Sequence, residues 1–123
     1  MIYIIDDDES GRSALELLFE SVDMKCMSFE SVEEFLFRVK ICRNDILLLD
    51  LQLPGMNGTD LLIKFIDDNV FIPVIIVTAH DEPHSRELTR QYGVKAYMVK
   101  PIDGKMLIEI IRTTKLDIEM HQT

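Results

Sequence analysis

The sequence predicts an α/β fold in which helices cover a parallel sheet. Short runs rich in branched aliphatic residues recur along the 123-residue chain, and polar residues follow most of them. Patterns typical of amphipathic helices lie between these runs. Continuous aliphatic runs are typical of strands buried on both faces, and the alternation of strands with helices specifies a parallel sheet. With 47% hydrophobic residues the chain can form one core, so we expect a single domain over residues 1–123.

Five segments are predicted as strands. They cover residues 2–5, 25–29, 46–49, 74–77 and 97–99. The first, third and fourth are almost entirely aliphatic, which favours a central place in the sheet.

The helix after the first strand is expected to begin at Asp8 or Glu9 and to end near Ser21. Its apolar stripe has i, i+3/i+4 spacing and consists of Ala14, Leu15, Leu18 and Val22. A capping box of Ser31 and Glu34 predicts the start of the second helix. The core stripe of that helix consists of Val32, Phe35, Leu36 and Val39.

A third helix is predicted after residues 54–58, a loop by its Pro and Gly content. Its stripe consists of Leu61, Leu62, Phe65 and Ile66. The fourth helix is expected over 83–92, with Gly93 as a left-handed C-cap. Leu88 is its only large aliphatic residue between positions 82 and 91, so it should pack weakly and be the mobile element.

The fifth helix should start after Pro101, with Asp103 as its N-cap. Its core stripe consists of Leu107, Ile110 and Ile111. The pattern continues to Met120, so we interpret residues 115–123 as a helix extension or the stub of a linker.

Charge and composition exclude several function classes. A net charge of -9 disfavours direct binding to nucleic acid or to anionic membranes, which needs concentrated Lys and Arg. Cys26 and Cys42 lack metal-ligand spacing, and the chain opens without a signal-like segment, so a cytoplasmic location is expected. The longest apolar stretch, near 71–77, is far below the ~18 residues that span a bilayer.

Polar side chains follow the predicted strands at their carboxyl ends. They are Asp6, Asp7, Asp50, Thr78 and Lys100. In open α/β sheets this edge is where ligands bind. Three carboxylates, a hydroxyl and an ammonium at one edge predict a phosphoryl-transfer site with a divalent metal.

The carboxylates suggest both the metal and the nucleophile. Crowded carboxylates repel one another by several kcal/mol at an effective dielectric of ~20, so ionised they favour a hard cation. Mg²⁺ fits because it takes oxygen ligands and keeps several waters. We assign Asp7 and Asp50 as direct ligands and Asp6 as a direct or water-mediated ligand. Asp50, on the central strand and facing Thr78 and Lys100, is the best placed nucleophile, with Lys100 as a point charge.

Four motifs in this order resemble the receiver domain of bacterial two-component response regulators. They are residues 4–8 (IIDDD), 48–58 (LLDLQLPGMNG), 77–80 (VTAH) and 97–101 (YMVKP). The resemblance extends from Ile2 to about Thr114. It implies a doubly wound, flavodoxin-like sheet of five strands in the order 2-1-3-4-5, flanked by five helices.

The resemblance also implies a function. Asp50 would accept a phosphoryl group from a sensor histidine kinase or phosphotransfer protein, and the Gln52 backbone carbonyl would be a further Mg²⁺ ligand. The protein would then catalyse its own aspartyl phosphorylation and dephosphorylation rather than act as a conventional enzyme. Thr78 would move toward the phosphoryl group and Tyr97 would swing inward, changing the face made by the fourth helix, fifth strand and fifth helix.

The output is a further expectation. A homodimer through that face is one hypothesis, and control of transcription is another. DNA would be contacted only through an output domain outside this chain. Gln52 and His80, two residues after Thr78, are in position to influence hydrolysis of the phosphoryl group.

Each site residue also has a simpler explanation. Acidic residues favour helix N-termini, and this is the better reading for Asp8 and Glu9. Tyr97 is as readily explained by half-buried packing, and His80 by a loop position without a role. Asp50 after four aliphatic residues needs compensation for burial, which favours function there.

Two other function classes were weighed. The segment from Asp6 to Ser10 also resembles the first motif of haloacid dehalogenase phosphatases, with Asp6 as nucleophile and Asp8 as acid/base. That alternative leaves Asp50 unexplained and lacks an acidic pair after Lys100. A flavodoxin-like FMN site would need a loop without the acidic run that follows the first strand, because carboxylates repel phosphate.

Overall fold

Five parallel strands form the centre of the molecule. The structure is a computed structural model that describes residues 1–121. The strands are β1 (Ile2–Ile5), β2 (Cys26–Phe29), β3 (Ile46–Leu49), β4 (Val74–Thr78) and β5 (Ala96–Val99). They are all parallel and lie in the order β2-β1-β3-β4-β5, which confirms the predicted fold class and strand order.

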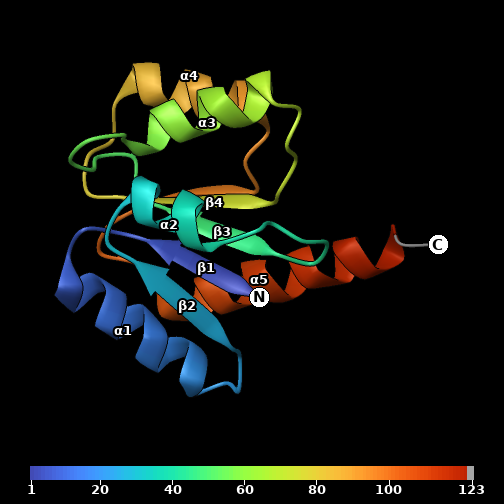
Figure 1. Ribbon diagram of the computed structural model, residues 1–123. Coiled ribbons are helices and arrows are strands. Elements are labelled where there is room, and N and C mark those ends of the chain that lie inside the picture. Colours follow the sequence, from blue (N-terminus) through green and yellow to red (C-terminus); the bar gives the residue numbers. More distant parts are fainter. Residues whose placement is uncertain (122–123) are drawn as a thin grey trace.

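Helices cover both faces of this sheet, which makes three layers (Figure 1). The helices are α1 (Glu9–Glu20), α2 (Val32–Arg38), α3 (Gly58–Asp67), α4 (Pro83–Tyr92) and α5 (Gly104–Met120). One core cluster packs α1 and α5 against one face, through residues such as Phe19 and Ile111. The other packs α2 and α3 against the opposite face, through residues such as Phe35 and Leu62.

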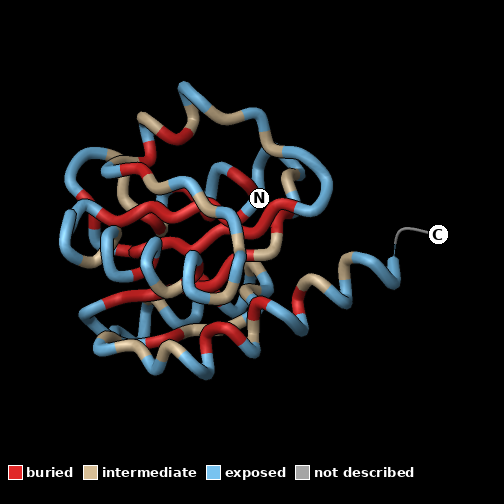
Figure 2. Tube along the Cα trace, turned by 90° about the horizontal axis from the view of Figure 1, so that it is seen from below, coloured by how far each residue is buried: buried red, intermediate tan, exposed pale blue. Residues whose placement is uncertain are grey.

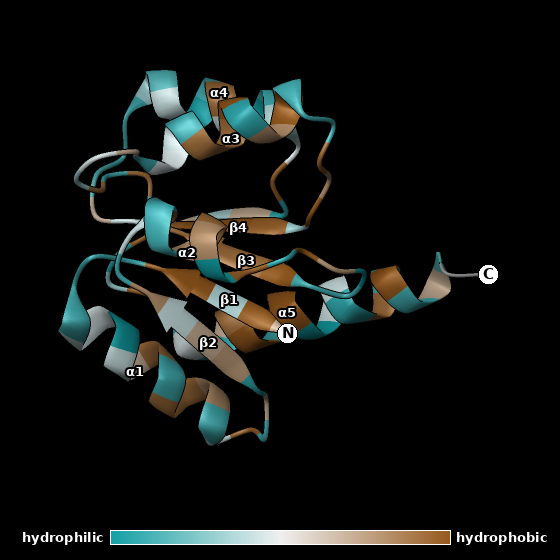
Figure 3. Ribbon diagram, in the orientation of Figure 1, coloured by the Kyte–Doolittle hydropathy of each residue, from teal (hydrophilic) through white to brown (hydrophobic). Residues whose placement is uncertain are grey.

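The two edges of the sheet differ from its centre. Every residue of β1, β3 and β4 is buried, whereas β2 and β5 are only partly buried. Figure 3 shows that brown, hydrophobic residues make up much of the sheet, whereas teal, hydrophilic residues lie along much of the helices. The aliphatic runs therefore form central strands because both of their faces are covered.

Three details of the predicted helices were wrong. Ile66, expected in the core stripe of α3, is 40% exposed because it lies outside the face that buries Leu61, Leu62 and Phe65. In α1 the predicted Leu15, Leu18 and Val22 pack on the core, but Ala14 is exposed. Phe19, outside the predicted stripe, is fully buried because it lies one turn after Leu15 on the same face. Ser31 caps α2 as expected by accepting from the Glu34 amide. In the described chain the Glu34 carboxylate pairs with Arg38, so the second half of the predicted capping box does not form.

The predicted ends of α4 and α5 are confirmed. Gly93 ends α4 with a φ of 87°, and the Asp103 side chain caps α5 by accepting from Met106. α5 continues to Met120 and its last turns project away from the body of the domain (Figure 2). Residues 122–123 of the predicted 115–123 extension lie outside the described part. Among the residues described, no helix is both long and apolar enough to cross a membrane.

Candidate functional site

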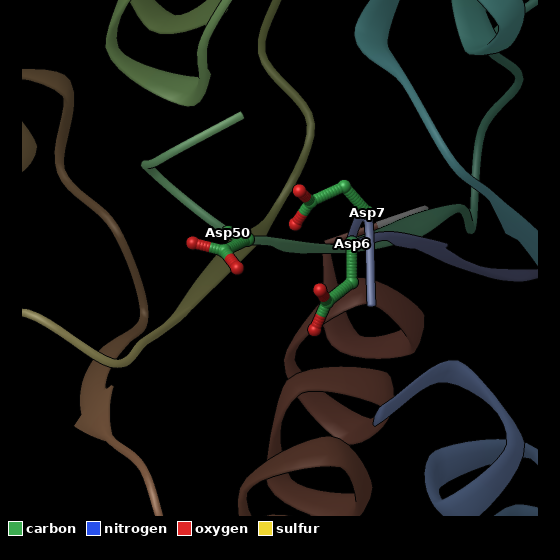
Figure 4. A group of neighbouring side chains, drawn as sticks. All are labelled: Asp6, Asp7 and Asp50. Carbon is green, nitrogen blue, oxygen red and sulfur yellow. The ribbon is translucent and has the colours of Figure 1, made fainter. Parts of the chain in front are cut away.

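Three carboxylates meet at the carboxyl ends of β1 and β3. The Asp50 amide donates a 3.0 Å hydrogen bond to the Ile5 carbonyl, which extends the pairing of these two strands by one residue. Asp50 therefore lies beside Asp6 and Asp7, and the ligand oxygens of all three lie within 4.8 Å of one another (Figure 4). Asp6 and Asp50 are buried, whereas Asp7 is exposed. The predicted carboxylate cluster thus forms, with one side open to solvent.

Lys100 brings a positive charge into this cluster from the end of β5. Its Nζ atom donates to Asp6 Oδ2 at 2.7 Å and to Asp50 Oδ2 at 3.4 Å. Burial alone disfavours the charged ammonium, but the hydrogen bond to Asp6 and the charges of both carboxylates outweigh it and raise the Lys100 pKa. Lys100 is therefore a charged bridge between two buried acids.

Asp50 is the acid whose charge is least well compensated. Burial raises the Asp50 pKa, and the neighbouring Asp6 charge acts in the same direction. The Gln52 backbone amide, which donates to Asp50 Oδ1 at 3.0 Å, and Lys100 act against this rise without cancelling it. A carboxylate in this position gains from any further cation placed beside it.

Asp6 is held from the α1 side by contacts that the sequence did not reveal. The Asp8 amide donates to Asp6 Oδ1 at 2.9 Å, and Arg12 donates from Nη1 to the Asp6 carbonyl at 2.7 Å. Asp8 itself caps α1 by accepting from Ser10, as its position in the acidic run suggested. Nothing in the periodicity of α1 singles out Arg12, because its contact depends on how the helix docks on the sheet.

Gly58 lets the start of α3 come close to the backbone of Asp50. A Cβ atom there would lie 2.3 Å from the Asp50 carbonyl oxygen and 2.7 Å from Leu51 Cα. The Gly58 amide donates to the Leu51 carbonyl at 3.0 Å. Since backbone atoms cannot yield as a flexible side chain can, a larger residue would displace the backbone at Asp50.

Thr78 and Tyr97 lie on β4 and β5, the two strands beyond the one that Asp50 follows. Thr78 is fully buried at the end of β4, and its hydroxyl and the His80 backbone are 3.3 Å apart. Tyr97 is paired in register with Ile76 and packs against the core on the same face of the sheet. Thr78, two residues after Ile76, points to that face too, so both predicted switch residues share it.

Gln52 and His80 are both exposed at the rim of the site. The Gln52 side chain donates from Nε2 to Glu82 Oε1 at 3.5 Å. Gln52 contacts Asp50 through its backbone amide instead. His80 reaches Thr78 through its own backbone. Their predicted influence on hydrolysis stays a prediction.

The comparison with known proteins identifies the family. Residues 2–112 match the family model described as the response regulator receiver domain. The chain belongs to this family. The match includes both Asp6 and Lys100, and the haloacid dehalogenase alternative has no support from it.

Two relatives of this receiver domain are described as transcription regulators. The chain is 37% identical over 101 residues to the DNA-binding transcriptional regulator NtrC of Klebsiella pneumoniae. The aligned segment covers 82% of the chain and 22% of that protein. The chain is 29% identical over 110 residues to the transcriptional regulatory protein FixJ of Rhizobium meliloti, covering 89% and 54%. The chain thus spans about a fifth of NtrC and half of FixJ.

Solved receiver structures have the same fold. The CheY-like receiver domain protein of Methanospirillum hungatei superposes with a TM-score of 0.86 at 25% identity, over 97% of this chain and 95% of that one. A FixJ-N structure superposes with a TM-score of 0.81 at 28% identity, over 94% and 92%. These likenesses extend over nearly the whole described receiver domain.

Proposed function

We propose that this receiver domain is a phosphorylation-activated switch in which Asp50 accepts the phosphoryl group. The observation that carries the proposal is the position of Asp50: it is buried at the end of the central strand, beside two other acids and within reach of Lys100. Membership of the receiver family supports the same assignment.

The reaction follows from the chemistry of these groups. An oxygen of the Asp50 carboxylate would attack the phosphorus of a phosphohistidine on a sensor kinase or phosphotransfer protein. A phosphorus–oxygen bond forms as the phosphorus–nitrogen bond breaks, and the electron pair leaves with the imidazole. Lys100, already bonded to Asp50 Oδ2, would hold the carboxylate first and the phosphoryl oxygens afterwards. Phosphoryl transfer depends on this kind of positioning and charge stabilisation.

The donor set suits Mg²⁺. Asp7 and Asp50 would bind it directly, Asp6 directly or through water, and the Gln52 carbonyl would add a fourth oxygen. Three carboxylates within 4.8 Å, one of them exposed to water, match a hard cation that keeps some of its hydration shell. When bound, the cation supplies charge neutralisation during transfer.

Phosphorylation would be transmitted through Thr78 and Tyr97 to the face formed by α4, β5 and α5. A phosphoryl group adds about -1.5 to -2 charge and strong acceptor oxygens, which favours movement of the Thr78 hydroxyl toward it. The names of the relatives support transcription as the output. With a net charge of -9, this domain would leave DNA contact to a part of the protein outside these residues.

The decisive experiment is intact mass after incubation with acetyl phosphate, with and without Mg²⁺. We expect one Mg²⁺-dependent phosphoryl adduct in the wild type and none in Asp50→Asn. Asp67→Asn is the matched control, because Asp67 is an exposed acid at the end of α3, and it should give the full adduct. An adduct in Asp50→Asn equal to wild type would remove Asp50 as the acceptor, and steady phosphate release that depends on Asp6 would favour hydrolysis instead.

A second experiment tests the switch. Tyr97→Ala should form the same adduct as wild type while losing phosphorylation-dependent association. Sedimentation velocity with and without acetyl phosphate measures that association for the homodimer hypothesis. Unchanged sedimentation of the wild type on phosphorylation would count against the dimer, and equal association of Tyr97→Ala would remove Tyr97 from the mechanism.

A further inference from the structure

Tyr97 occupies an inward position that its own hydroxyl does not stabilise. The ring packs against the core on the face covered by α2 and α3, and the hydroxyl is shielded from solvent. Within the described chain the hydroxyl makes no hydrogen bond of ordinary geometry. Burial and the Asp81 charge raise the Tyr97 pKa, and the nearby Glu82 backbone opposes that rise, so these groups surround the hydroxyl without giving it a well-formed hydrogen bond. A contact to the ring itself would add to this weak hold.

Arg86 makes such a contact. Its guanidinium carbon lies 4.4 Å from the centre of the Tyr97 ring, a distance suited to a cation–π interaction. Asp81 fixes the guanidinium by accepting from Arg86 Nε at 2.6 Å and from Nη2 at 3.0 Å. Two parallel hydrogen bonds set the plane of the guanidinium as well as its place. Asp81 thus orients Arg86 over the ring.

These three residues join separate parts of the chain around a groove. Asp81 lies in the connection between β4 and α4, Arg86 in α4 and Tyr97 on β5. Arg86 and Tyr97 line a groove of ≈ 540 Å³, together with Pro83, Val94 and Ala96. The groove leaves room beside the ring, so the fold itself does not lock Tyr97 in place.

We propose that Asp81 and Arg86 form a clasp that holds Tyr97 inward and sets how often the ring moves out. Both are positioning residues, since they act through Tyr97 and do not touch the carboxylate cluster in the described contacts. This inference deepens the proposed function, because it rests on Tyr97 as the switch: phosphorylation would further favour an inward position that the ring already occupies part of the time. It concerns the unphosphorylated protein, so it can be tested separately from the role of Asp50.

The test uses ¹⁹F NMR of the whole chain labelled with 3-fluorotyrosine, without acetyl phosphate. The chain has three tyrosines, and Tyr97→Phe assigns the resonance of interest. The shift between H₂O and D₂O reports how exposed each ring is. In Asp81→Asn and Arg86→Gln we expect the outward population of Tyr97 to rise about two- to fivefold.

Arg90→Gln is the matched control. Arg90 also lies in α4, pairs with Glu87 and lines the same groove, but it makes no cation–π contact with Tyr97 among the described residues. Its Tyr97 resonance should stay as in wild type. Arg86→Lys keeps the positive charge but loses the planar guanidinium that donates two parallel hydrogen bonds. Its outward population of Tyr97 should therefore lie between those of wild type and Arg86→Gln.

Tyr92 reports whether α4 stays in place, because its hydroxyl donates to the Ile72 carbonyl at 2.8 Å. The Tyr92 resonance should not move in any of these variants. An unchanged Tyr97 resonance in Asp81→Asn and Arg86→Gln would overturn the clasp, as would an equal shift in Arg90→Gln. Exposure of Tyr92 together with Tyr97 would also overturn it, since the ion pair would then hold the helix and not the ring.

Intact mass with acetyl phosphate on the same variants separates the two proposals. Full adduct with no change at Tyr97 would leave the role of Asp50 standing and remove the clasp. The expected shift at Tyr97 in a protein that forms no adduct would leave the clasp standing and remove the proposed function.

Discussion

α3 and α4 are neighbours of equal length with different anchoring. Each has ten residues. α3 begins with a capping box between Asn57 and Asp60 and buries four residues, including Leu61 and Phe65. Among the described residues of α4, Thr89 is the one that is buried, and Glu82 makes no side-chain cap. In Figure 3 the outer surface of α4 is correspondingly teal.

The difference separates two tasks in one small domain. α3 is tied to the β3 end, where Gly58 packs against the Asp50 backbone, so it helps to fix the position of Asp50. α4 has little buried area, and its Arg86, which pairs with Asp81, lies over the Tyr97 ring. A helix with few buried contacts opens at low free energy, which suits the switch role proposed for the face formed by α4, β5 and α5.

The largest expected effect comes from removing one leucine side chain from each of the two helices. Leu62→Ala in α3 removes a fully buried side chain and should lower the free energy of unfolding by ~2–5 kcal/mol. Leu88→Ala in α4 removes a half-buried side chain and should cost about 1 kcal/mol or less. Urea denaturation measures both. Equal losses would mean that α4 is anchored as firmly as α3.

The next largest effect comes from the charge of the buried Asp50 carboxylate. Burial raises the pKa of Asp50 in the folded protein. The protonated form of Asp50 therefore favours the folded state, and this stabilisation is lost as the pH rises from the ordinary pKa through the raised one. Ionised Asp50 therefore destabilises the metal-free protein at pH 7, and Asp50→Asn should raise the free energy of unfolding by about 1–2 kcal/mol. Asp67→Asn serves as the exposed control, with no change expected. A less stable Asp50→Asn would contradict this account.

The helix caps offer a smaller and opposite pair of effects. Asn57→Ala removes the N-cap of α3 and should cost ~1 kcal/mol. Glu82→Asp places a shorter acid at the uncapped start of α4, where the backbone is already extended, and should stabilise by roughly 0.5 kcal/mol. Thermal unfolding can resolve both. If Glu82→Asp makes no difference, the missing cap is not what weakens α4.

The smallest expected effect concerns the hydroxyl beside α4. Tyr97→Phe removes a buried group without a hydrogen bond, so stability should stay level or rise by up to ~1 kcal/mol. Tyr92→Phe is the contrasting control, because its hydroxyl bonds to the Ile72 carbonyl and its loss should cost ~1 kcal/mol. A loss of stability in Tyr97→Phe equal to that in Tyr92→Phe would point to a hydrogen-bond partner for Tyr97.

Much of the fold could be predicted because its signals are local. The aliphatic runs became β1, β3 and β4, and Gly93 ended α4 in the left-handed conformation that glycine adopts without strain. The predicted capping box of α2 failed because of a competing contact: the Glu34 carboxylate accepts from Arg38 and not from the backbone at the helix start. The stripe of α1 was misplaced at Ala14 because several faces of that helix carry apolar residues.

The sequence by itself determined which residues stand at strand ends, and therefore that Asp6, Asp7, Asp50 and Lys100 would meet. Parallel strands end at one edge of the sheet, and the strand order 2-1-3-4-5 implied by the family resemblance makes the strands before Asp6 and Asp50 neighbours. Only the tertiary structure decided what surrounds them: Arg12 on the Asp6 carbonyl, and Arg86 over Tyr97. These contacts join separate elements, and they depend on how the helices dock, which no local pattern encodes.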